Sequence, residues 1–239
     1  NIEVPGNWTM QNVGDDPIYT NIRMPFDNEP PFVPDDNPTG VYKLKFNIKD
    51  SWTDRRTIIH LAGVESCYYL YINNKQVGFN KGSRTPCEFD ITEFIHSGEN
   101  SIDVVVIRWS DGSFIEDQDH WWMAGIHRDV YIYSTDRVYI DDLFTKTTLT
   151  NDYTDGLLNL ELSIISALKV NKKYHIDIHL IDSSGEIVLK DEKIKETYGL
   201  PVRSTESLEN KKFENSIYIN YDIKAPKIWS AESPNLYKL

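Results

Sequence analysis

Cysteine is scarce in this sequence, since only Cys67 and Cys87 occur among its 239 residues. Two cysteines cannot build the several cross-links of a small disulfide-stapled domain, nor a cysteine-rich zinc site. Both lie in or beside segments that alternate like β-strands and could in principle pair. Because small buried thiols are common, two free thiols are the favoured interpretation.

Positive charge is also in short supply. There are 25 Lys and Arg against 37 Asp and Glu, a formal net charge of -12. Such a surface repels phosphate backbones, so nucleic acid is not an expected partner. No apolar run reaches the ~18 to 20 residues that cross a bilayer, and the mean hydropathy is -0.47. We therefore expect no membrane partner either.

The beginning of the chain lacks an initiator Met and a signal-like apolar stretch. We expect a piece of a longer protein, and the sequence leaves its cellular compartment undetermined. Several catalytic motifs are also missing, namely His-Glu-x-x-His, Gly-x-Ser-x-Gly and a phosphate-binding glycine loop. His175 and His179 share one face of a predicted strand, but four residues at ~3.3 Å each place them ~13 Å apart, too far for one metal ion.

Alternating apolar and polar residues are abundant and predict an all-β fold. Residues 1–40 carry seven prolines and predict an extended, wrapping segment with no long helix. Asn73-Asn74 indicates a tight turn between two strands, and residues 90–95 predict one helical turn that ends before Gly98. Half-buried strands are predicted where apolar residues recur at every second position, as at Tyr42, Leu44, Phe46 and Ile48.

A domain boundary is predicted near residue 136, which gives domains of residues 1–136 and 137–239. Roughly 100 residues with about seven strands fit an immunoglobulin-like or fibronectin-like sandwich in the second domain. Ser183-Ser184-Gly185 predicts a hairpin turn there. Residues 190–215 are charged and weakly patterned, and predict a solvated excursion.

Residues 108–130 hold the densest chemistry of the chain, on a loop between two β-like runs. Hard cations bind several oxygens from one loop, but the spacing of the carboxylates does not fit an EF-hand, and solvated or N-capping side chains are the alternative. His120 and His127 are further candidate contacts. The carboxylates are Asp111, Glu116, Asp117 and Asp119.

The loop also contains three tryptophans. Trp109 predicts core packing, which is the common role of Trp in a β-sandwich, whereas Trp121 and Trp122 stay open between the core and a sugar-stacking role. Arg128-Asp129 predicts a structural ion pair at the start of a strand.

Several motifs occur in an order that resembles the large β-galactosidases of glycoside hydrolase family 2. In the loop, they are RWSDGS (108–113), EDQD (116–119) and WMAGIHRDV (122–130). Upstream they are VPGNW (4–8), PIYTN (17–21), PPFVP (30–34) and NPTGVY (37–42), and the chain closes on PKIWSAESPNLY (226–237).

This resemblance implies a jelly-roll-like sugar-binding β-sandwich, its N-terminal edge truncated, followed by the immunoglobulin-like domain. It implies retaining hydrolysis of terminal β-D-galactosides by the full-length enzyme, usually a homo-oligomer. Both catalytic glutamates would lie beyond Leu239 in a catalytic barrel. We therefore expect no catalytic residue in this chain and no activity from it alone.

The resemblance also implies two site residues. Asn21 matches the amide that reaches the galactose hydroxyls, and an amide offers both donors and acceptors to a neutral polyol. Asp119 matches the carboxylate that accepts hydrogen bonds from the sugar and helps to hold a sodium ion. The full-length enzyme is expected to use sodium and magnesium, with the other sodium ligands in the barrel.

Two other readings stay open. The chain could be a self-contained, non-catalytic carbohydrate-binding or adhesive β-sandwich protein, since sandwiches host many functions. Within the same family the sugar could be a glucuronide or a mannoside, although residues 17–21 and 30–40 resemble the galactosidase branch more closely.

Overall fold

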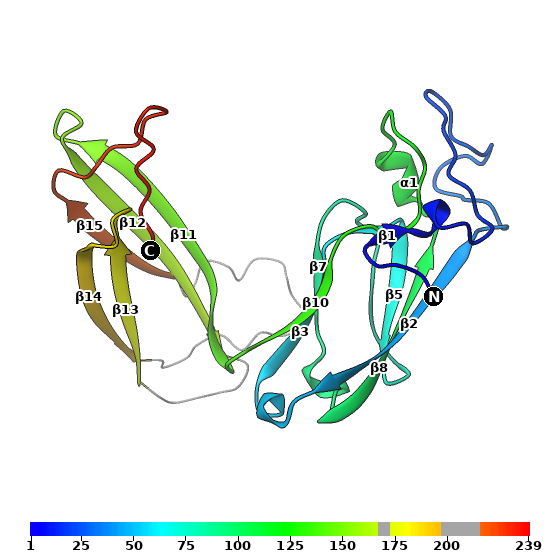
Figure 1. Cartoon of the computed structure of the whole chain (residues 1–239), viewed down its shortest axis with the longest axis horizontal. Coiled ribbons are helices and arrows are strands. Elements are labelled where there is room, and N and C mark those ends of the chain that lie inside the picture. The colour runs from blue at the N-terminus through cyan, green and yellow to red at the C-terminus, as the bar shows by residue number, and fades with distance from the viewer. Residues whose placement is uncertain (167–172, 197–215) are drawn as a thin grey trace. The chain divides into compact units, whose positions relative to one another are not determined.

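The computed structural model describes residues 1–166, 173–196 and 216–239. The chain divides into two compact units, Asn1–Asp136 and Arg137–Leu239, and the strands that build them are labelled in Figure 1. Every pair of named strands is antiparallel in the part of the chain that is described. The all-β prediction is confirmed.

Two sheets of the first unit enclose its core. The four-stranded sheet has the order β2-β8-β5-β6, and the three-stranded sheet has the order β10-β3-β7. A small third sheet, β1-β9-β4, joins the N-terminal segment to the far end of the 108–130 loop. The strands are β1 (Gly6–Asn7), β2 (Thr39–Ile48), β3 (Arg56–Leu61), β4 (Val64–Glu65), β5 (Cys67–Ile72), β6 (Lys75–Asn80), β7 (Cys87–Asp90), β8 (Gly98–Ile107), β9 (Gly125–Ile126) and β10 (Val130–Thr135).

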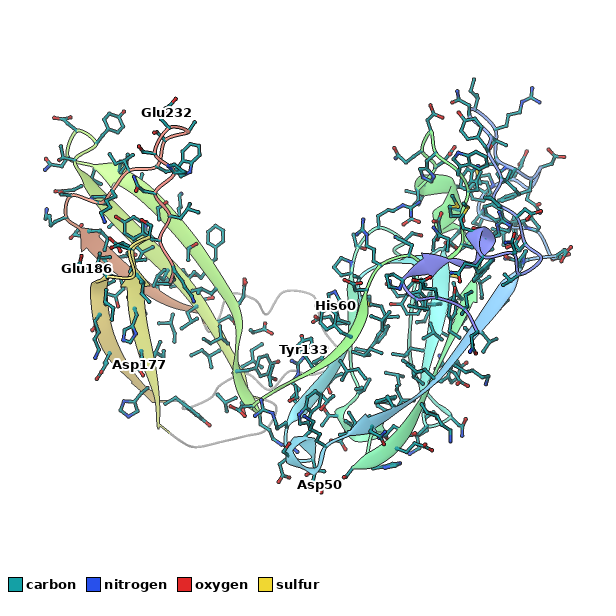
Figure 2. All side chains as sticks on the ribbon, in the orientation of Figure 1. Asp50, His60, Tyr133, Asp177, Glu186 and Glu232 are labelled. Atoms are coloured by element: carbon teal, nitrogen blue, oxygen red, sulfur yellow. The ribbon has the colours of Figure 1, made fainter. Side chains whose placement is uncertain are left out.

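The core of the first unit follows from the alternation in its strands. Ile59 of β3 packs in the same buried cluster as Leu70 of β5 and Val104 of β8. Leu44 departs from the prediction, because it is 66% exposed while Ile48 on the same face is buried. On the outer face of the β10-β3-β7 sheet, His60 and Tyr133 both form a hydrogen bond with the carboxylate of Glu88. Both residues are labelled in Figure 2.

The N-terminal 38 residues form little regular structure, in line with the predicted wrapping segment. They contain β1 and one 3-10 turn, η1 (Trp8–Met10). Two more 3-10 turns are η2 (Asp50–Trp52) and η3 (Thr92–Phe94), and η3 confirms the helical turn expected before Gly98. Asn73 and Asn74 take positive φ of 50° and 64° and form the predicted turn from β5 to β6.

The second unit packs a three-stranded sheet, β11-β12-β15, against a hairpin, β13-β14. Leu158 and Leu160 of β12 recur at every second position and are buried with Ile178 and Leu180 of β13. The described residues hold five strands of this unit, against about seven predicted. They are β11 (Val138–Thr150), β12 (Asp155–Ser166), β13 (Lys173–Ile181), β14 (Ile187–Glu196) and β15 (Ser216–Ile223).

The predicted hairpin at Ser183-Ser184-Gly185 is confirmed, since it joins β13 to β14 and Gly185 has φ +87°. The predicted excursion over residues 190–215 is wrong at its start, because residues 190–196 continue β14. Backbone pairing with β13 compensates for weak apolar patterning there. The rest of the predicted excursion, residues 197–215, lies outside the described residues.

Both cysteines are free thiols, with Cys67 buried and Cys87 half-buried, as favoured above. Burial raises the pKa of each thiol. Within the described ranges no helix has the length and apolar character needed to cross a membrane.

Candidate functional site

Arg108 anchors the start of the 108–130 loop. Its guanidinium is buried and forms an ion pair with Asp15 of the N-terminal segment. It also donates to the carbonyl oxygens of Asp16 at 3.0 Å and Trp122 at 3.2 Å. One buried cation therefore joins the start of the loop and Trp122 to the wrapping segment, through charge-assisted hydrogen bonds.

Two carboxylates of the loop, Asp111 and Glu116, make structural contacts. Asp111 caps α1 (Gly112–Ile115) by accepting from the Gly112 amide at 3.0 Å. Its hydrogen bond with the Lys81 ammonium, at 2.6 Å, holds the pKa of this carboxyl below its usual range. Glu116 accepts from the Ser83 amide at 2.8 Å. The N-capping alternative is thus right for Asp111.

The segment that contains Asn21 lies beside the loop that contains Asp119. Ile18 and Trp122 exchange two backbone hydrogen bonds, and the Trp122 indole donates to the Thr20 hydroxyl at 2.7 Å. The Tyr19 hydroxyl donates to Asp119 Oδ1 at 2.8 Å, and this hydrogen bond raises the pKa of Tyr19.

Asn21 and Asp119 are both exposed, and each stands within two residues of this junction. Among the described residues, no hydrogen bond joins the two side chains to each other. The fold thus places the two predicted site residues on neighbouring segments, each at an exposed position.

The three tryptophans of the loop separate into two roles. Trp109 and Trp122 are buried and their rings lie 5.6 Å apart, so the core prediction for Trp109 is confirmed and Trp122 joins it. Trp121 is 52% exposed, and its ring lies 5.7 Å from that of Tyr19, which is 50% exposed. This half-exposed aromatic pair borders Asp119.

The ion pair predicted for Arg128 with Asp129 is wrong. The Arg128 guanidinium donates instead to the carbonyl oxygen of Arg84 at 3.0 Å, because the Lys81–Arg84 connection lies against the end of the loop. His127 is half-buried, and this burial lowers its pKa. Both of its ring nitrogens are enclosed and lack a hydrogen-bond partner among the described residues. His120 is partly exposed and faces Arg84, with 3.3 Å between its Nε2 and Arg84 Nη2.

No group of three or more His, Cys, Asp or Glu side chains gathers as a metal site in the described parts of the chain. Asp119 can nevertheless supply one oxygen ligand to a metal ion, because its Oδ2 has no hydrogen-bond partner among the described residues. Hollows of about 390 Å³ lie elsewhere, one in each unit, beside Trp8 and Tyr42 in the first and beside Leu158 and Trp229 in the second. The candidate residues therefore lie on an open surface.

Sequence reasoning missed Tyr19 and Arg84 as members of this region. Tyr19 stands inside the PIYTN motif, so its position was a usable signal. Arg84 lies 36 residues before His120, and no periodicity links residues that far apart.

Comparison with known proteins identifies the family. Residues 1–136 match the sugar-binding domain of the glycosyl hydrolases family 2, and residues 138–239 match a second region of that family. The chain belongs to glycosyl hydrolase family 2. In this family 2 chain, the candidate residues Asn21 and Asp119 both fall within the sugar-binding match.

Curated relatives match along the whole chain. A β-galactosidase of Priestia megaterium is 40% identical over 243 residues, covering 100% of this family 2 chain and 22% of the relative. A β-galactosidase of Vibrio cholerae is 38% identical and covers 99% of the chain and 22% of the relative. The chain thus spans about a fifth of the length of these relatives.

Solved structures share the fold at low identity. A Bacteroides uniformis β-glucuronidase 2 has a TM-score of 0.72 at 19% identity, covering 99% of this chain and 26% of its own. A family 2 glycosyl hydrolase of Bacteroides cellulosilyticus has a TM-score of 0.69, also at 19% identity, covering 99% of this chain and 29% of its own. These likenesses concern the fold alone.

Proposed function

We propose that this chain is the N-terminal, non-catalytic part of a retaining β-galactosidase, and that it contributes sugar contacts through Asn21 and Asp119. The observation that carries the proposal is the hydrogen bond from Tyr19 to Asp119, which places the PIYTN motif against the acidic loop. The β-galactosidases at 40% and 38% identity support the substrate class.

The chemistry of this surface suits a neutral sugar. An amide at Asn21 and a carboxylate at Asp119 can hydrogen-bond hydroxyl groups, which both donate and accept. The half-exposed ring of Trp121 offers an apolar surface beside them. This combination of a few polar groups with an aromatic wall is typical of small-molecule sites.

Bond cleavage is assigned to residues outside this chain. A retaining glycosidase needs two carboxyl groups about 5 to 5.5 Å apart, one as acid and one as nucleophile. Asp111 and Glu116 are already engaged in structural contacts with Lys81 and Ser83. In the proposed full-length enzyme, the catalytic glutamates belong to the barrel.

The same proposal includes a sodium ion held in part by Asp119. One carboxylate cannot complete the several oxygen ligands of a hard cation, so the remaining sodium ligands belong to the barrel. The full-length enzyme is also expected to use magnesium. Sodium would neutralise this carboxylate beside the sugar. We also propose that the full-length enzyme is a homo-oligomer and binds neither nucleic acid nor membranes.

The test is an assay of chromogenic β-galactosides with the purified 239-residue chain and with the full-length gene product. The full-length protein is expected to hydrolyse galactosides in preference to glucuronides and mannosides, and the chain alone is expected to be inactive. Turnover by the chain would contradict the assignment of cleavage to the barrel. A gene that encodes no barrel, with sugar binding by the chain, would favour a self-contained binding protein.

A further inference from the structure

The connection between β6 and β7 packs against the loop that carries Asp119. Two side chains and one backbone amide of this connection contact the loop at successive positions. Lys81 pairs with Asp111 at 2.6 Å, the Ser83 amide donates to Glu116 at 2.8 Å, and Arg84 reaches His120 at 3.3 Å. The last contact is the one nearest to Asp119 in the chain.

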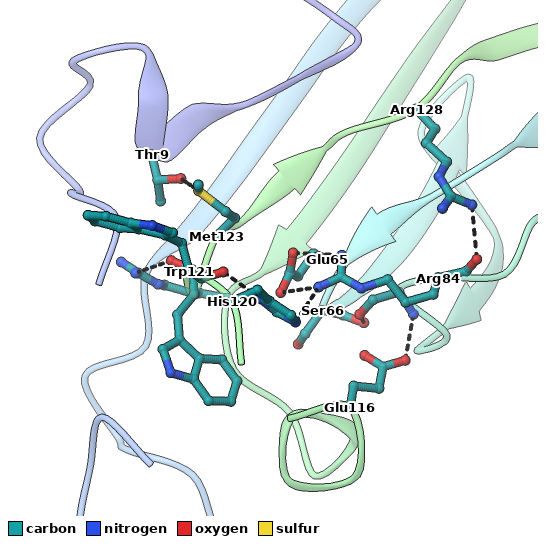
Figure 3. Close-up of polar contacts among 12 residues, drawn as sticks. Thr9, Glu65, Ser66, Arg84, Glu116, His120, Trp121, Met123 and Arg128 are labelled. Atoms are coloured by element: carbon teal, nitrogen blue, oxygen red, sulfur yellow. Dashed lines mark hydrogen bonds and ion pairs between the residues drawn. The ribbon is translucent and has the colours of Figure 1, made fainter. Parts of the chain in front are cut away.

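Arg84 is itself fixed by a bidentate ion pair with Glu65. Its two terminal nitrogens lie 3.1 and 3.2 Å from the two carboxylate oxygens of Glu65, as Figure 3 shows. The Glu65 side chain is only 9% exposed. Burial raises the pKa of this carboxyl, and the charge of Arg84 opposes that shift. A buried carboxylate paired in this fork geometry holds the guanidinium in one orientation.

One of these two nitrogens of Arg84, Nη2, also contacts Nε2 of His120 at 3.3 Å. The Nδ1 atom of His120 lies 2.8 Å from the carbonyl oxygen of Trp121. Because a carbonyl can only accept, Nδ1 carries the proton, and Nε2 of the neutral ring then accepts from Arg84. A continuous chain of contacts runs from buried Glu65 through Arg84 and His120 to the backbone of Trp121 (Figure 3).

Asp119 therefore stands between two anchors. The first anchor is the hydrogen bond that the Asp119 carboxylate accepts from the Tyr19 hydroxyl. The second is the set of contacts that His120 and Trp122 make, which fix the backbone that follows Asp119. If a sugar or an ion displaces the Tyr19 hydroxyl from Asp119, the contacts of His120 and Trp122 still hold the carboxylate in place.

We propose that Arg84 is a positioning residue for sugar binding: held by Glu65, it fixes His120 and thereby the orientation of the Asp119 carboxylate. This inference rests on the proposed function, because it concerns the same sugar contact. Small misplacements of a binding group lower the rate strongly, by as much as about 100-fold for 1 Å.

The test uses Arg84→Lys in the full-length enzyme. Lysine keeps the charge near Glu65 but lacks the planar fork that spans Glu65 and His120. We expect kcat/KM for galactosides to fall roughly 10- to 100-fold, and the Tm to fall as well because the pair with buried Glu65 is weakened. The matched control is Arg55→Lys, because Arg55 pairs with Asp136 and Ser134 elsewhere in the first unit. It should leave kcat/KM unchanged.

A double-mutant cycle separates positioning from general damage. If Arg84 acts through Asp119, Arg84→Lys should lower kcat/KM by less than about twofold in an Asp119→Asn background, because residues that act together are not additive. Fully additive losses, or an unaffected Arg84→Lys enzyme, would overturn the inference.

Hydrogen exchange tests the positioning role of Arg84 independently of the proposed function. In the same full-length protein, amides of residues 117–122 should exchange faster in Arg84→Lys than in the unsubstituted protein or in Arg55→Lys. Unchanged exchange there would overturn the positioning role whether or not the protein hydrolyses galactosides. An unsubstituted protein with no galactosidase activity would instead overturn the proposed function.

Discussion

Acidic residues that look alike in the sequence of the 108–130 loop have different surroundings in the structure. Asp111 is paired with Lys81, whereas Asp119 accepts a hydrogen bond only from the neutral Tyr19 hydroxyl among the described residues. The surroundings of Asp119 therefore leave its charge uncompensated. This is the state in which a carboxylate gains most from a cation or from several hydroxyl groups.

Asp119→Asn in the full-length enzyme tests whether the charged carboxylate of Asp119 contributes to sugar binding. We expect kcat/KM for β-galactosides to fall about 10- to 100-fold, since a hydrogen bond to a charged group contributes ~1.5 to 3 kcal/mol. The Tm should stay unchanged because the side chain is exposed. Asp36→Asn, an exposed carboxylate in the same unit, is the control. Kinetics identical to those of the unsubstituted enzyme would remove Asp119 from the site.

Gly125 lies near the far end of the 108–130 loop, where the chain pairs with β1 and β4. Its φ is +129°, and an added Cβ would lie 2.9 Å from both the Trp8 amide and the Tyr42 hydroxyl. Gly125→Ala should therefore destabilise the protein by about 2 kcal/mol or more, from strain and overpacking together. Gly98 has φ +87° with open space around it, so Gly98→Ala reports the backbone strain alone. Equal losses in urea unfolding would refute the packing argument.

At the scale of strands and turns, the sequence predicts most of what the structure contains. The alternation around Leu158 and Leu160 identifies β12, and Asn73-Asn74 identifies the tight turn after β5. Local pattern fails at β14, where residues 190–196 are mostly charged and only pairing with β13 makes them a strand. Strand formation depends on a partner that the segment itself does not reveal.

The β13-β14 hairpin depends on one carboxylate. Asp182 Oδ1 accepts from the Ser184 and Glu186 amides at 2.8 and 3.0 Å, and Lys227 pairs with the other oxygen. The hydrogen bond with Lys227 is the main reason that the pKa of Asp182 lies well below its usual range. A carboxyl whose pKa is lowered by folding contributes stability above its unfolded pKa, and that contribution is lost as the pH falls.

Asp182→Asn should therefore be less stable than the unsubstituted protein at pH 7, with a gap in Tm that narrows as the pH falls below about 3.9, the pKa of an unfolded Asp. Thermal unfolding of the second unit between pH 7 and pH 3 measures this gap. Asp177→Asn is the control, because Asp177 is exposed on β13. A gap that stays constant over this pH range would show that ionisation of Asp182 does not stabilise the hairpin.

At the scale of the whole molecule, the candidate site joins segments about 100 residues apart. Tyr19 and Asp119 meet because the wrapping segment pairs with Trp122 and with Arg108, contacts that no local pattern encodes. Resemblance to a family could place Asn21 and Asp119 together, since it draws on other folded chains. The alternation and composition of the residues alone indicate only an all-β fold and an acidic, aromatic loop.

The two units have separate cores, and this predicts separate responses to core damage. The buried cluster around Leu70 draws on residues of the first unit, and the cluster around Leu160 draws on residues of the second. Leu70→Ala and Leu160→Ala should each cost about 2 to 5 kcal/mol, from lost burial and the cavity left behind. Hydrogen exchange should show lost protection in residues 1–136 for the first variant and in residues 137–239 for the second. Loss of protection across both units from either substitution would mean that they unfold as one cooperative body.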